Sequence, residues 1–239
     1  MARIKIRYDF FMPTQPAAIL LDIDNTVYAY APCHEAGLKA AFAASGDSDE
    51  AAFRADYATA REQAKARIPH TGAAHCRLLY FKRLLENRLG HTALTETLTL
   101  SAAYWDGYHT AMQLDNGVRE CLAHWQELRV PTAWITDFTT EQQLRKLQTL
   151  HLENLVTHTI TAEEVGAVKP DPRGVDEALT RFGIAPGPDV WFIGDDTKRD
   201  RGVAEARGLT FFWRDREDVD FWQKLLPERG AGEAGHDGI

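Results

Sequence analysis

Five short apolar segments are spaced along the 239-residue chain, and an amphipathic segment precedes each of the last four. The apolar segments are residues 17–21, 130–135, 155–160, 190–193 and 209–213. Runs of this length, rich in β-branched and aromatic residues, are typical of strands buried on both faces of a parallel sheet. The amphipathic segments, which predict helices, are residues 116–128, 140–150, 173–182 and 200–207. This alternation indicates an α/β fold with a doubly wound, Rossmann-like parallel sheet.

A long interval between the first two apolar segments interrupts the alternation. Residues 27–112 have an almost entirely helical pattern, rich in Ala, Glu, Arg and Leu. This interval is too long for an ordinary connection between a strand and a helix. We therefore expect a helical cap at 27–112, inserted after the first core strand, and a core made of 1–26 and 113–239. Alternating apolar side chains at Ile4, Ile6 and Tyr8 also indicate a peripheral strand.

Composition and charge exclude several classes of protein. Hydrophobic residues make up 44% and charged residues 26%, which excludes a disordered chain. The net charge of -8 provides no general basic field for a nucleic-acid polymer. No apolar stretch approaches the roughly 18 residues of a membrane helix, and the first residues lack the apolar centre of a signal peptide. We expect a cytoplasmic monomer or homodimer with reduced cysteines and no membrane partner.

Asp22 follows the first apolar segment directly, Asp24 comes two positions later, and the hydroxyl residue Thr26 two positions after that. In an extended segment the two carboxylates face the same side. One could attack phosphorus while the other moves a proton, and the pair would attract a divalent cation. The same residue types are favoured in turns that end strands, so this motif alone leaves a purely structural role open.

Further polar residues come at or soon after the ends of the later strands, the edge at which open parallel sheets bind ligands. Asp195 and Asp200 could complete an oxygen-rich Mg²⁺ site with Asp22, or could form an acidic loop that caps the next helix. Thr136 ends the second apolar segment, where its hydroxyl could donate to a phosphoryl oxygen. Lys169 precedes a proline, and this residue by itself would indicate only a charge on the surface.

In combination these motifs are far more specific than any one of them. An Asp-x-Asp-x-Thr segment, a threonine at a strand end, a Lys-Pro pair and a Gly-Asp-Asp segment with a further Asp occur in this order between residues 19 and 200. The order resembles the haloacid dehalogenase-like (HAD) hydrolase superfamily over nearly the whole chain. The resemblance implies a magnesium-dependent enzyme with a helical cap of the type called C1, which closes over the substrate and excludes water.

The resemblance also implies a role for each matching residue. Asp22 would be the nucleophile that forms an aspartyl-phosphate, and Asp24 would act as general acid and then as general base. Thr136 and Lys169 would hold the phosphoryl oxygens, an arrangement that suits phosphoryl transfer. The implied catalytic residues are Asp22, Asp24, Thr136 and Lys169, and the implied magnesium ligands are Asp22, Asp24 through its backbone carbonyl, Asp195 and Asp200.

Asp24 distinguishes between the reactions known in this superfamily, because the dehalogenases and phosphonatases of the superfamily lack an acid at that position. We therefore predict a phosphomonoester hydrolase that acts on a small phosphorylated metabolite. The segments 22–28, 135–147 and 161–170 are similar to nucleotidase-type members, which makes a nucleoside monophosphate a candidate substrate. A phosphomutase of the same superfamily and a non-catalytic HAD-like binding scaffold stay open. An oxidoreductase is disfavoured, because no Gly-x-Gly-x-x-Gly motif follows the first strand.

Four residues are candidates for substrate binding. Tyr28 follows the nucleophile closely, and Arg67 and His70 fall in a break between predicted cap helices. Asp137 comes directly after Thr136, where similar proteins commonly have Asn or a small residue. A second acid at this place would repel the phosphate unless it points away. A packing role for Tyr28 and solvated surface positions for Arg67 and His70 are alternatives at this point.

Overall fold

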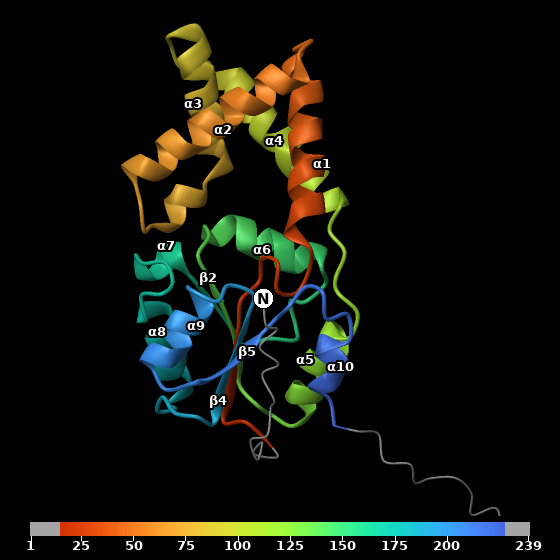
Figure 1. Cartoon of the computed structure of the whole chain (residues 1–239), viewed down its shortest axis with the longest axis vertical. Coiled ribbons are helices and arrows are strands. Elements are labelled where there is room, and N and C mark those ends of the chain that lie inside the picture. Colours follow the sequence, from red (N-terminus) through yellow and green to blue (C-terminus); the bar gives the residue numbers. More distant parts are fainter. Residues whose placement is uncertain (1–14, 228–239) are drawn as a thin grey trace, which may run out of the picture.

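Five parallel strands form the sheet in a computed structural model that describes residues 15–227. Their order across the sheet is β3-β2-β1-β4-β5 (Figure 1). The predicted fold class is therefore confirmed, and each strand lies at one of the five predicted apolar segments. The peripheral strand predicted around Ile6 lies outside the described residues. The strands are β1 (Ala18–Leu21), β2 (Thr132–Thr136), β3 (His158–Thr161), β4 (Val190–Gly194) and β5 (Thr210–Trp213).

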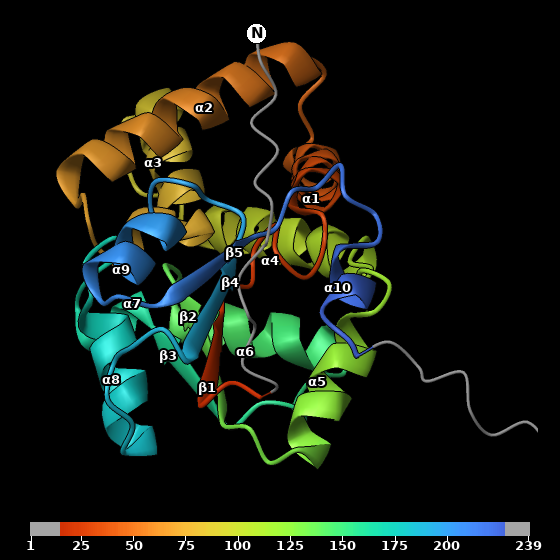
Figure 2. The ribbon, with the colours of Figure 1, turned by 60° about the horizontal axis from the view of Figure 1, so that its bottom comes forward.

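Helices cover both faces of the sheet (Figure 2). Alternate side chains of the strands pack into two hydrophobic layers, one on each face. In β1, Ala18 and Leu20 belong to the layer that contains α8 and α9, whereas Ile19 and Leu21 belong to the layer that contains α5 and α6. Both faces are covered, so the strand is apolar throughout rather than alternating. The four helices are α5 (Val118–Glu127), α6 (Thr140–Thr149), α8 (Arg173–Phe182) and α9 (Asp200–Ala206).

Two helices of four residues complete the core, α7 (Ala162–Val165) and α10 (Phe221–Lys224). A single turn is too short to produce the helical periodicity that identifies longer helices. The second of them brings the buried side chains of Phe221 and Trp222 against α5. Among the helices between residues 15 and 227, none combines the length and the apolar character that a membrane span requires.

Four long helices and one 3₁₀ turn follow β1 and stand beyond the edge of the sheet at which β1 ends (Figure 1). All of them fall between residues 27 and 112, and we propose that they form the predicted cap. We refer to α1–α4 as the cap helices. The elements are α1 (Tyr30–Ser45), α2 (Glu50–Arg67), the 3₁₀ turn η1 (Gly72–His75), α3 (Arg77–Leu89) and α4 (Leu94–Thr110).

The helices α1 and α4 pack closely because each has a glycine at their contact. A Cβ atom added at Gly37 would lie 2.8 Å from the carbonyl oxygen of Tyr104. A Cβ atom added at Gly107 would lie 2.7 Å from the carbonyl oxygen of Ala36. Both distances are shorter than any real contact of a methyl carbon, so a larger residue at either place would push the helices apart.

We expect Gly107→Ala to destabilise the protein, even though alanine favours a helix by about 1 kcal/mol over glycine. The clash with a backbone atom of α1 costs about 1–3 kcal/mol, as overpacked cores do, and outweighs that gain. Urea unfolding followed by circular dichroism measures the change. The exposed Thr99→Ala substitution in the same helix, which raises helix propensity without a clash, is the control. A Gly107→Ala protein as stable as the control would contradict this packing argument.

Candidate active site

The site lies where the chain direction across the sheet reverses. From β1 the chain continues to β2 and β3 on one side, and later to β4 and β5 on the other. The loops after β1 and β4 therefore diverge at the carboxyl edge, the place where open α/β sheets bind ligands. The N–H of Asp22 still donates to the carbonyl oxygen of Ile193 in β4, at 2.9 Å, so the first residue of the loop is held by the sheet.

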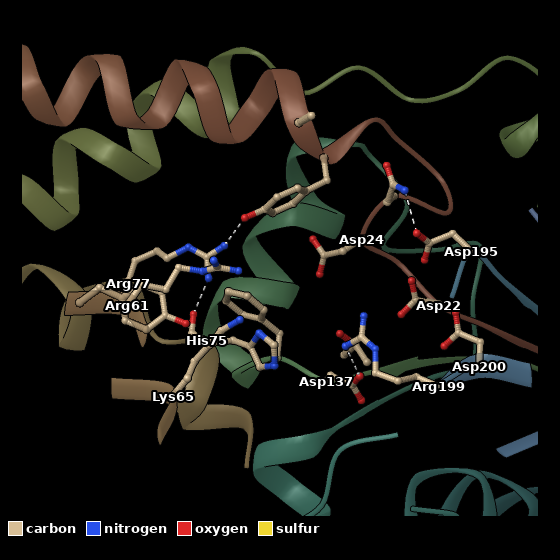
Figure 3. Close-up of a pocket in the computed structure, with 16 residues that line it drawn as sticks. Asp22, Asp24, Arg61, Lys65, His75, Arg77, Asp137, Asp195, Arg199 and Asp200 are labelled. Carbon is tan, nitrogen blue, oxygen red and sulfur yellow. Dashed lines mark hydrogen bonds and ion pairs between the residues drawn. The ribbon is translucent and has the colours of Figure 1, made fainter. Parts of the chain in front are cut away.

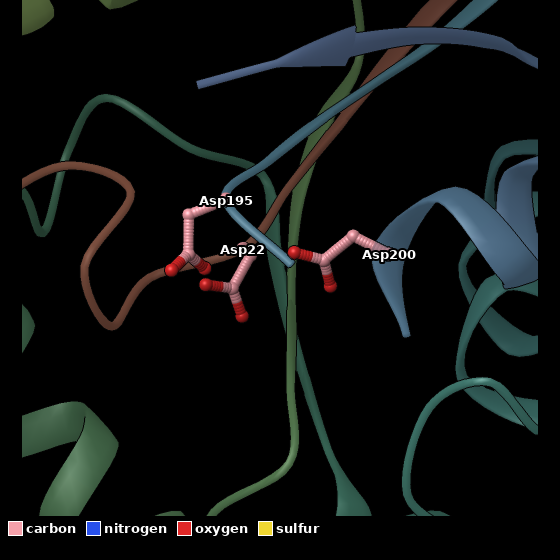
Figure 4. Close-up of side chains that lie close together, drawn as sticks. All are labelled: Asp22, Asp195 and Asp200. Carbon is pink, nitrogen blue, oxygen red and sulfur yellow. The ribbon is translucent and has the colours of Figure 1, made fainter. Parts of the chain in front are cut away.

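Three carboxylates meet at this edge, those of Asp22, Asp195 and Asp200 (Figure 4). One oxygen from each lies within 4.8 Å of the others, and Asp22 and Asp200 are buried. Burial raises the pKa of Asp22 well above its ordinary value; Lys169 opposes this shift, and the nearby carboxylates add to it. Burial also raises the pKa of Asp195. The cluster therefore concentrates negative charge that the protein itself neutralises only in part.

One buried cation, Lys169, lies within this cluster. Its Nζ atom is 2.5 Å from Asp22 Oδ1 and 2.7 Å from Asp200 Oδ1, and it also donates to the carbonyl oxygen of Ile135 at 3.1 Å. Among the described residues Lys169 is the one cation in ion-pair contact with these three carboxylates, so the acidic groups outnumber the cations paired with them. Hard oxygen donors with excess negative charge are the donor set that a divalent cation such as Mg²⁺ or Ca²⁺ prefers. The residues present therefore fit a divalent-cation site.

Gly194 allows Asp200 to join the cluster. A Cβ atom at position 194 would lie 2.2 Å from Asp200 Oδ2, so any other residue would occupy the place of that carboxylate. The same oxygen accepts a hydrogen bond from the N–H of Asp196 at 3.0 Å. The glycine at the end of β4 is therefore needed for the position of the third carboxylate.

Two residues of the loop after β1 orient the carboxylates of Asp22 and Asp195. Thr26 Oγ1 donates to Asp22 Oδ2 at 3.0 Å, while Lys169 holds the other oxygen of Asp22. Asn25 adopts a left-handed conformation, with φ of 67°, and its Nδ2 atom donates to Asp195 Oδ2 at 2.7 Å. Asparagine tolerates this conformation better than most residues. Asp22 is thus fixed by one neighbour on each oxygen.

Three side chains contact the carboxylate of the second acid, Asp24. The sequence predicted no role for two of them and a different role for the third. The ammonium group of Lys146, which is fully buried, forms an ion pair with Asp24. Gln143 Nε2 donates to Asp24 Oδ2 at 2.7 Å, and the hydroxyl of Tyr28 donates to Oδ1. Burial alone would raise the pKa of Asp24, but Lys146, Tyr28 and Gln143 outweigh it and lower the pKa to about 2.

The sequence contained a signal for Lys146 and Gln143. Both lie on the buried side of the amphipathic helix α6, together with Leu147. Polar residues are uncommon at buried positions unless they are paired, so their place in the helical pattern indicates partners elsewhere. Gln143 also donates to the hydroxyl of Thr136, which leaves the hydroxyl proton of that threonine available to another acceptor.

Asp137 has protein partners on both of its carboxylate oxygens. The backbone N–H of Lys169 donates to Oδ1 at 2.7 Å, and Arg199 Nη1 donates to Oδ2 at 2.9 Å. The repulsion expected from a second acid beside Thr136 is therefore offset by Arg199. In this arrangement Asp137 positions the backbone of Lys169, and both of its carboxylate oxygens already have protein partners.

A cavity of about 390 Å³ lies between the cap helices and the carboxyl edge of the sheet (Figure 3). The predicted site residue Lys169 is not part of the lining, but its Nζ atom contacts the carboxylate of Asp22, which is. Arg61, Lys65, His75 and Arg77 line the cap side. The predicted site residues that line it are Asp22, Asp24, Thr136, Asp137, Asp195 and Asp200.

Three of the predicted substrate-binding residues lie away from this lining. Tyr28 is fully buried, with its hydroxyl between Asp24 and the hydroxyl of Tyr108 in α4. Arg67 and His70 are exposed, and Arg67 lines a separate surface groove between α2 and α3. The cavity lining includes neither residue, so their predicted role in substrate binding is corrected. The side of α2 that faces the cavity carries Arg61 and Lys65, one turn apart, whereas Arg67, the last residue of α2, faces elsewhere. His70 lies beyond the end of that helix.

Comparison with known proteins identifies relatives of this chain. The model of the haloacid dehalogenase-like hydrolases matches residues 16–207. A ribulose-1,5-bisphosphate 5-phosphatase from Halopiger xanaduensis is 37% identical over 196 residues, which are 80% of this chain and 82% of that protein. A glyceraldehyde 3-phosphate phosphatase from Methanopyrus kandleri is 24% identical over 80% of this chain and 81% of that protein.

Solved structures share the fold at low sequence identity. The HAD hydrolase YfnB from Bacillus subtilis superposes with a TM-score of 0.66 at 18% identity and covers 90% of this chain and 93% of that one. A HAD phosphatase from Thermococcus onnurineus gives a TM-score of 0.64 at 20% identity, over 92% of this chain and 89% of that one. The chain therefore belongs to the haloacid dehalogenase-like hydrolase family, and the predicted family and enzyme class are confirmed.

The pairing of Lys146 with Asp24 is testable by a double-mutant cycle. We expect Lys146→Met to lower the free energy of unfolding by about 2 kcal/mol, less than for a fully buried pair because Asp24 is partly exposed. Asp24→Asn leaves Lys146 buried without a counter-charge and should cost more. The double variant should lose less than the sum of the two, since each single change leaves one partner unpaired.

Urea unfolding of the four proteins measures the coupling. Arg145→Met, which removes an exposed cation from the same helix, is the matched control and should change stability by no more than about 0.5 kcal/mol. Strictly additive losses in the cycle would show that Lys146 and Asp24 do not depend on each other.

Proposed function

We propose that the chain is a magnesium-dependent phosphomonoester hydrolase that uses Asp22 as a covalent nucleophile. The observation that carries the proposal is the position of Asp22 at the carboxyl edge of the sheet, beside two further carboxylates. Its own carboxylate is held by Lys169 at 2.5 Å and by Thr26 at 3.0 Å. A carboxylate fixed on both sides is already oriented for in-line attack, which reduces the entropic part of the barrier. The relatives named as phosphatases support the same class of reaction.

In the first step Asp22 attacks phosphorus, the bond to the leaving oxygen breaks, and an aspartyl-phosphate forms on Asp22. Lys169 offsets the repulsion between the carboxylate and the phosphoryl oxygens, and Thr136 donates its hydroxyl proton to one of those oxygens. In the second step water attacks the phosphorus, the bond from phosphorus to the carboxylate oxygen of Asp22 breaks, and inorganic phosphate leaves, which restores the carboxylate of Asp22.

Asp24 moves the protons of both steps. In the structure it is held as a carboxylate by Lys146, the form that accepts a proton from the attacking water of the second step. Donation to the leaving alcohol in the first step requires that Asp24 carry a proton. Its contact with Lys146 must therefore loosen when substrate is bound. The first step therefore needs the ion pair between Lys146 and Asp24 to be loosened, whereas the second step proceeds with that ion pair formed.

The carboxylates of Asp22, Asp195 and Asp200 would hold Mg²⁺, with the backbone carbonyl of Asp24 as a further oxygen ligand. A bound Mg²⁺ supplies positive charge that lowers the repulsion between Asp22 and the phosphoryl oxygens. The residual negative charge of the cluster, after Lys169 is counted, is the reason to expect the ion there.

Two substrate classes are consistent with a cavity of about 390 Å³, a size that suits a small metabolite. The nucleotidase-like segments favour nucleoside monophosphates. The relative at 37% identity favours sugar phosphates, because its name gives ribulose 1,5-bisphosphate as its substrate. A cytoplasmic location and a monomeric or homodimeric state stay predictions from the sequence.

We expect Asp22→Asn to lower kcat by at least roughly a thousandfold while the fold is kept, because the change is nearly isosteric and removes the nucleophile. Phosphate release from a panel of phosphomonoesters measures the loss. The panel contains nucleoside monophosphates, ribulose 5-phosphate, ribulose 1,5-bisphosphate, fructose 6-phosphate and fructose 1,6-bisphosphate. Asp189→Asn, an exposed position before β4, is the control. Comparable turnover by Asp22→Asn and wild type would disprove covalent catalysis by Asp22.

The same panel separates the alternatives that the sequence left open. A phosphomutase would move phosphate within a sugar phosphate and release little of it. A binding scaffold would neither move nor release phosphate from any compound, with or without Mg²⁺. Either result would overturn the proposed hydrolase activity.

We also expect Mg²⁺ to raise the thermal unfolding temperature of the wild-type protein, since an ion that binds only the folded state stabilises it. Asp195→Asn removes one carboxylate from the cluster and should abolish most of this shift, as well as the activity that Mg²⁺ restores after treatment with EDTA. Differential scanning fluorimetry with and without MgCl₂ measures the shift independently of catalysis. An equal shift in the variant would place the ion elsewhere.

A further inference from the structure

We infer that the cap side of the cavity binds a second anionic group of the substrate, a phosphate or a carboxylate, through Arg77, Lys65 and Arg61. The enzyme would then prefer small metabolites with an anionic group at each end. This inference rests on the proposed phosphatase function, because it concerns the same cavity and the same bound substrate.

Arg77 is the strongest element of this argument. It is 5% exposed, lines the cavity, and forms no ion pair with any carboxylate among residues 15–227. Among the residues that the structure describes, its guanidinium group donates to neutral oxygens only. These are the hydroxyl of Tyr30 at 2.7 Å, the carbonyl of His75 at 2.7 Å and the hydroxyl of Tyr104 at 3.3 Å. A buried charge without a counter-charge is costly, so a cation in this position is expected to have an anionic partner at some stage.

Aromatic rings surround Arg77 and account for part of its stability, but they do not replace a counter-ion. The guanidinium carbon lies 5.1 Å from the ring centre of Phe138 and 5.5 Å from that of Tyr80. Cation–π contacts of this kind contribute modestly and leave the charge in place. The three hydrogen bonds use three of the five N–H groups of arginine, so two N–H groups remain for a ligand.

Two further cations on α2 face the same part of the cavity. Arg61 and Lys65 are one helical turn apart and both line it (Figure 3). Among the described residues Lys65 has no acidic partner within ion-pair distance, and Arg61 contacts only its exposed neighbour Glu62, at 3.2 Å. Burial and the nearby positive charges of Arg61, Arg77 and Arg199 lower the pKa of Lys65. The cations therefore repel one another until an anion lies between them.

The cavity thus has two electrostatic ends. The carboxylates of Asp22, Asp195 and Asp200 form the end at the sheet, and Arg61, Lys65 and Arg77 belong to the cap (Figure 3). His75 lies on the cap side too, but burial and Arg77 lower its pKa to about 4, so it is neutral near pH 7.

A substrate with one phosphate satisfies only one of these ends. Its phosphoryl group is attacked at Asp22, and Lys65 and Arg77 are left without an acidic partner among the described residues. A second phosphate or a carboxylate on the same molecule would pair with them and draw on charge-assisted hydrogen bonds, which are the stronger kind. The far end of a nucleoside monophosphate is an uncharged base. We therefore expect doubly anionic metabolites to be better substrates than nucleoside monophosphates.

Matched pairs of substrates test the inference, because the members of a pair differ by one anionic group. Fructose 1,6-bisphosphate is compared with fructose 6-phosphate, and 3-phosphoglycerate with glycerol 3-phosphate. The first pair adds a phosphate and the second a carboxylate, so the two arms also identify which anion is recognised. In at least one pair we expect kcat/KM to be about tenfold to a hundredfold higher for the doubly anionic member, mainly through KM.

Variants of the cap cations link that preference to the proposed residues. Lys65→Gln and Arg61→Gln should each lower the ratio of the two kcat/KM values toward one, by about threefold to tenfold. Arg77→Gln should bring the ratio close to one. Lys39→Gln, which removes an exposed cation from α1, is the matched control and should leave the ratio at the wild-type value. Should Arg77→Gln fail to fold, the two α2 variants still decide the outcome, since neither side chain is fully buried.

Binding measured without turnover provides a second readout. Isothermal titration of the Asp22→Asn protein with fructose 1,6-bisphosphate should show weaker binding when Lys65→Gln is added. Phosphate release that is equal within every pair, or a ratio that the three cap variants leave unchanged, would overturn the inference while the phosphatase itself stands. Release from no compound at all would instead overturn the proposed function.

Discussion

The contact of Lys169 with Asp22 and Asp200 is the interaction on which the rest of the site depends. The ammonium group lies 2.5 Å from one carboxylate and 2.7 Å from the other, and all three side chains are buried. Without this cation the cluster would place three carboxylates in a poorly solvated space, and their protonation would remove the proposed nucleophile. With it, the cluster keeps enough negative charge to bind a divalent ion. Asp137 secures the arrangement, because it accepts the backbone N–H of Lys169.

The acid Asp24 connects the core to the cap. The hydroxyl of Tyr28 contacts both Asp24 and the hydroxyl of Tyr108 in α4, while Lys146 contacts Asp24 from α6 and lies 5.4 Å from the ring centre of Tyr108. A movement of α4 relative to α6 therefore changes the surroundings of Asp24, the proposed proton-transfer group. This coupling follows from the contacts of Tyr28, Tyr108 and Lys146, and it links the proposed cap to the site at the sheet edge.

The sequence predicted the core and the acidic residues because both have local signals. Apolar runs that end in carboxylates identify β1 and β4, and their pairing brings Asp22 and Asp195 together. The cap-side residues have no such signal. Arg61 and Lys65 look like ordinary charges of an amphipathic helix, and only the packing of α2 over the sheet shows that they, and not Arg67 or His70, face the cavity. Lys146 and Gln143 were readable as buried polar residues, but their common partner Asp24 is more than 100 positions away in the chain.

The measurement that tests the central claim most directly is the identification of the phosphorylated residue. The protein is mixed with a substrate that it hydrolyses, quenched in acid during the first turnovers, digested and examined by mass spectrometry. The account predicts that a peptide containing Asp22 gains the mass of one phosphoryl group, and that the gain disappears in Asp22→Asn. A phosphoryl group on any other side chain, or rapid turnover without any phosphorylated peptide, would contradict it.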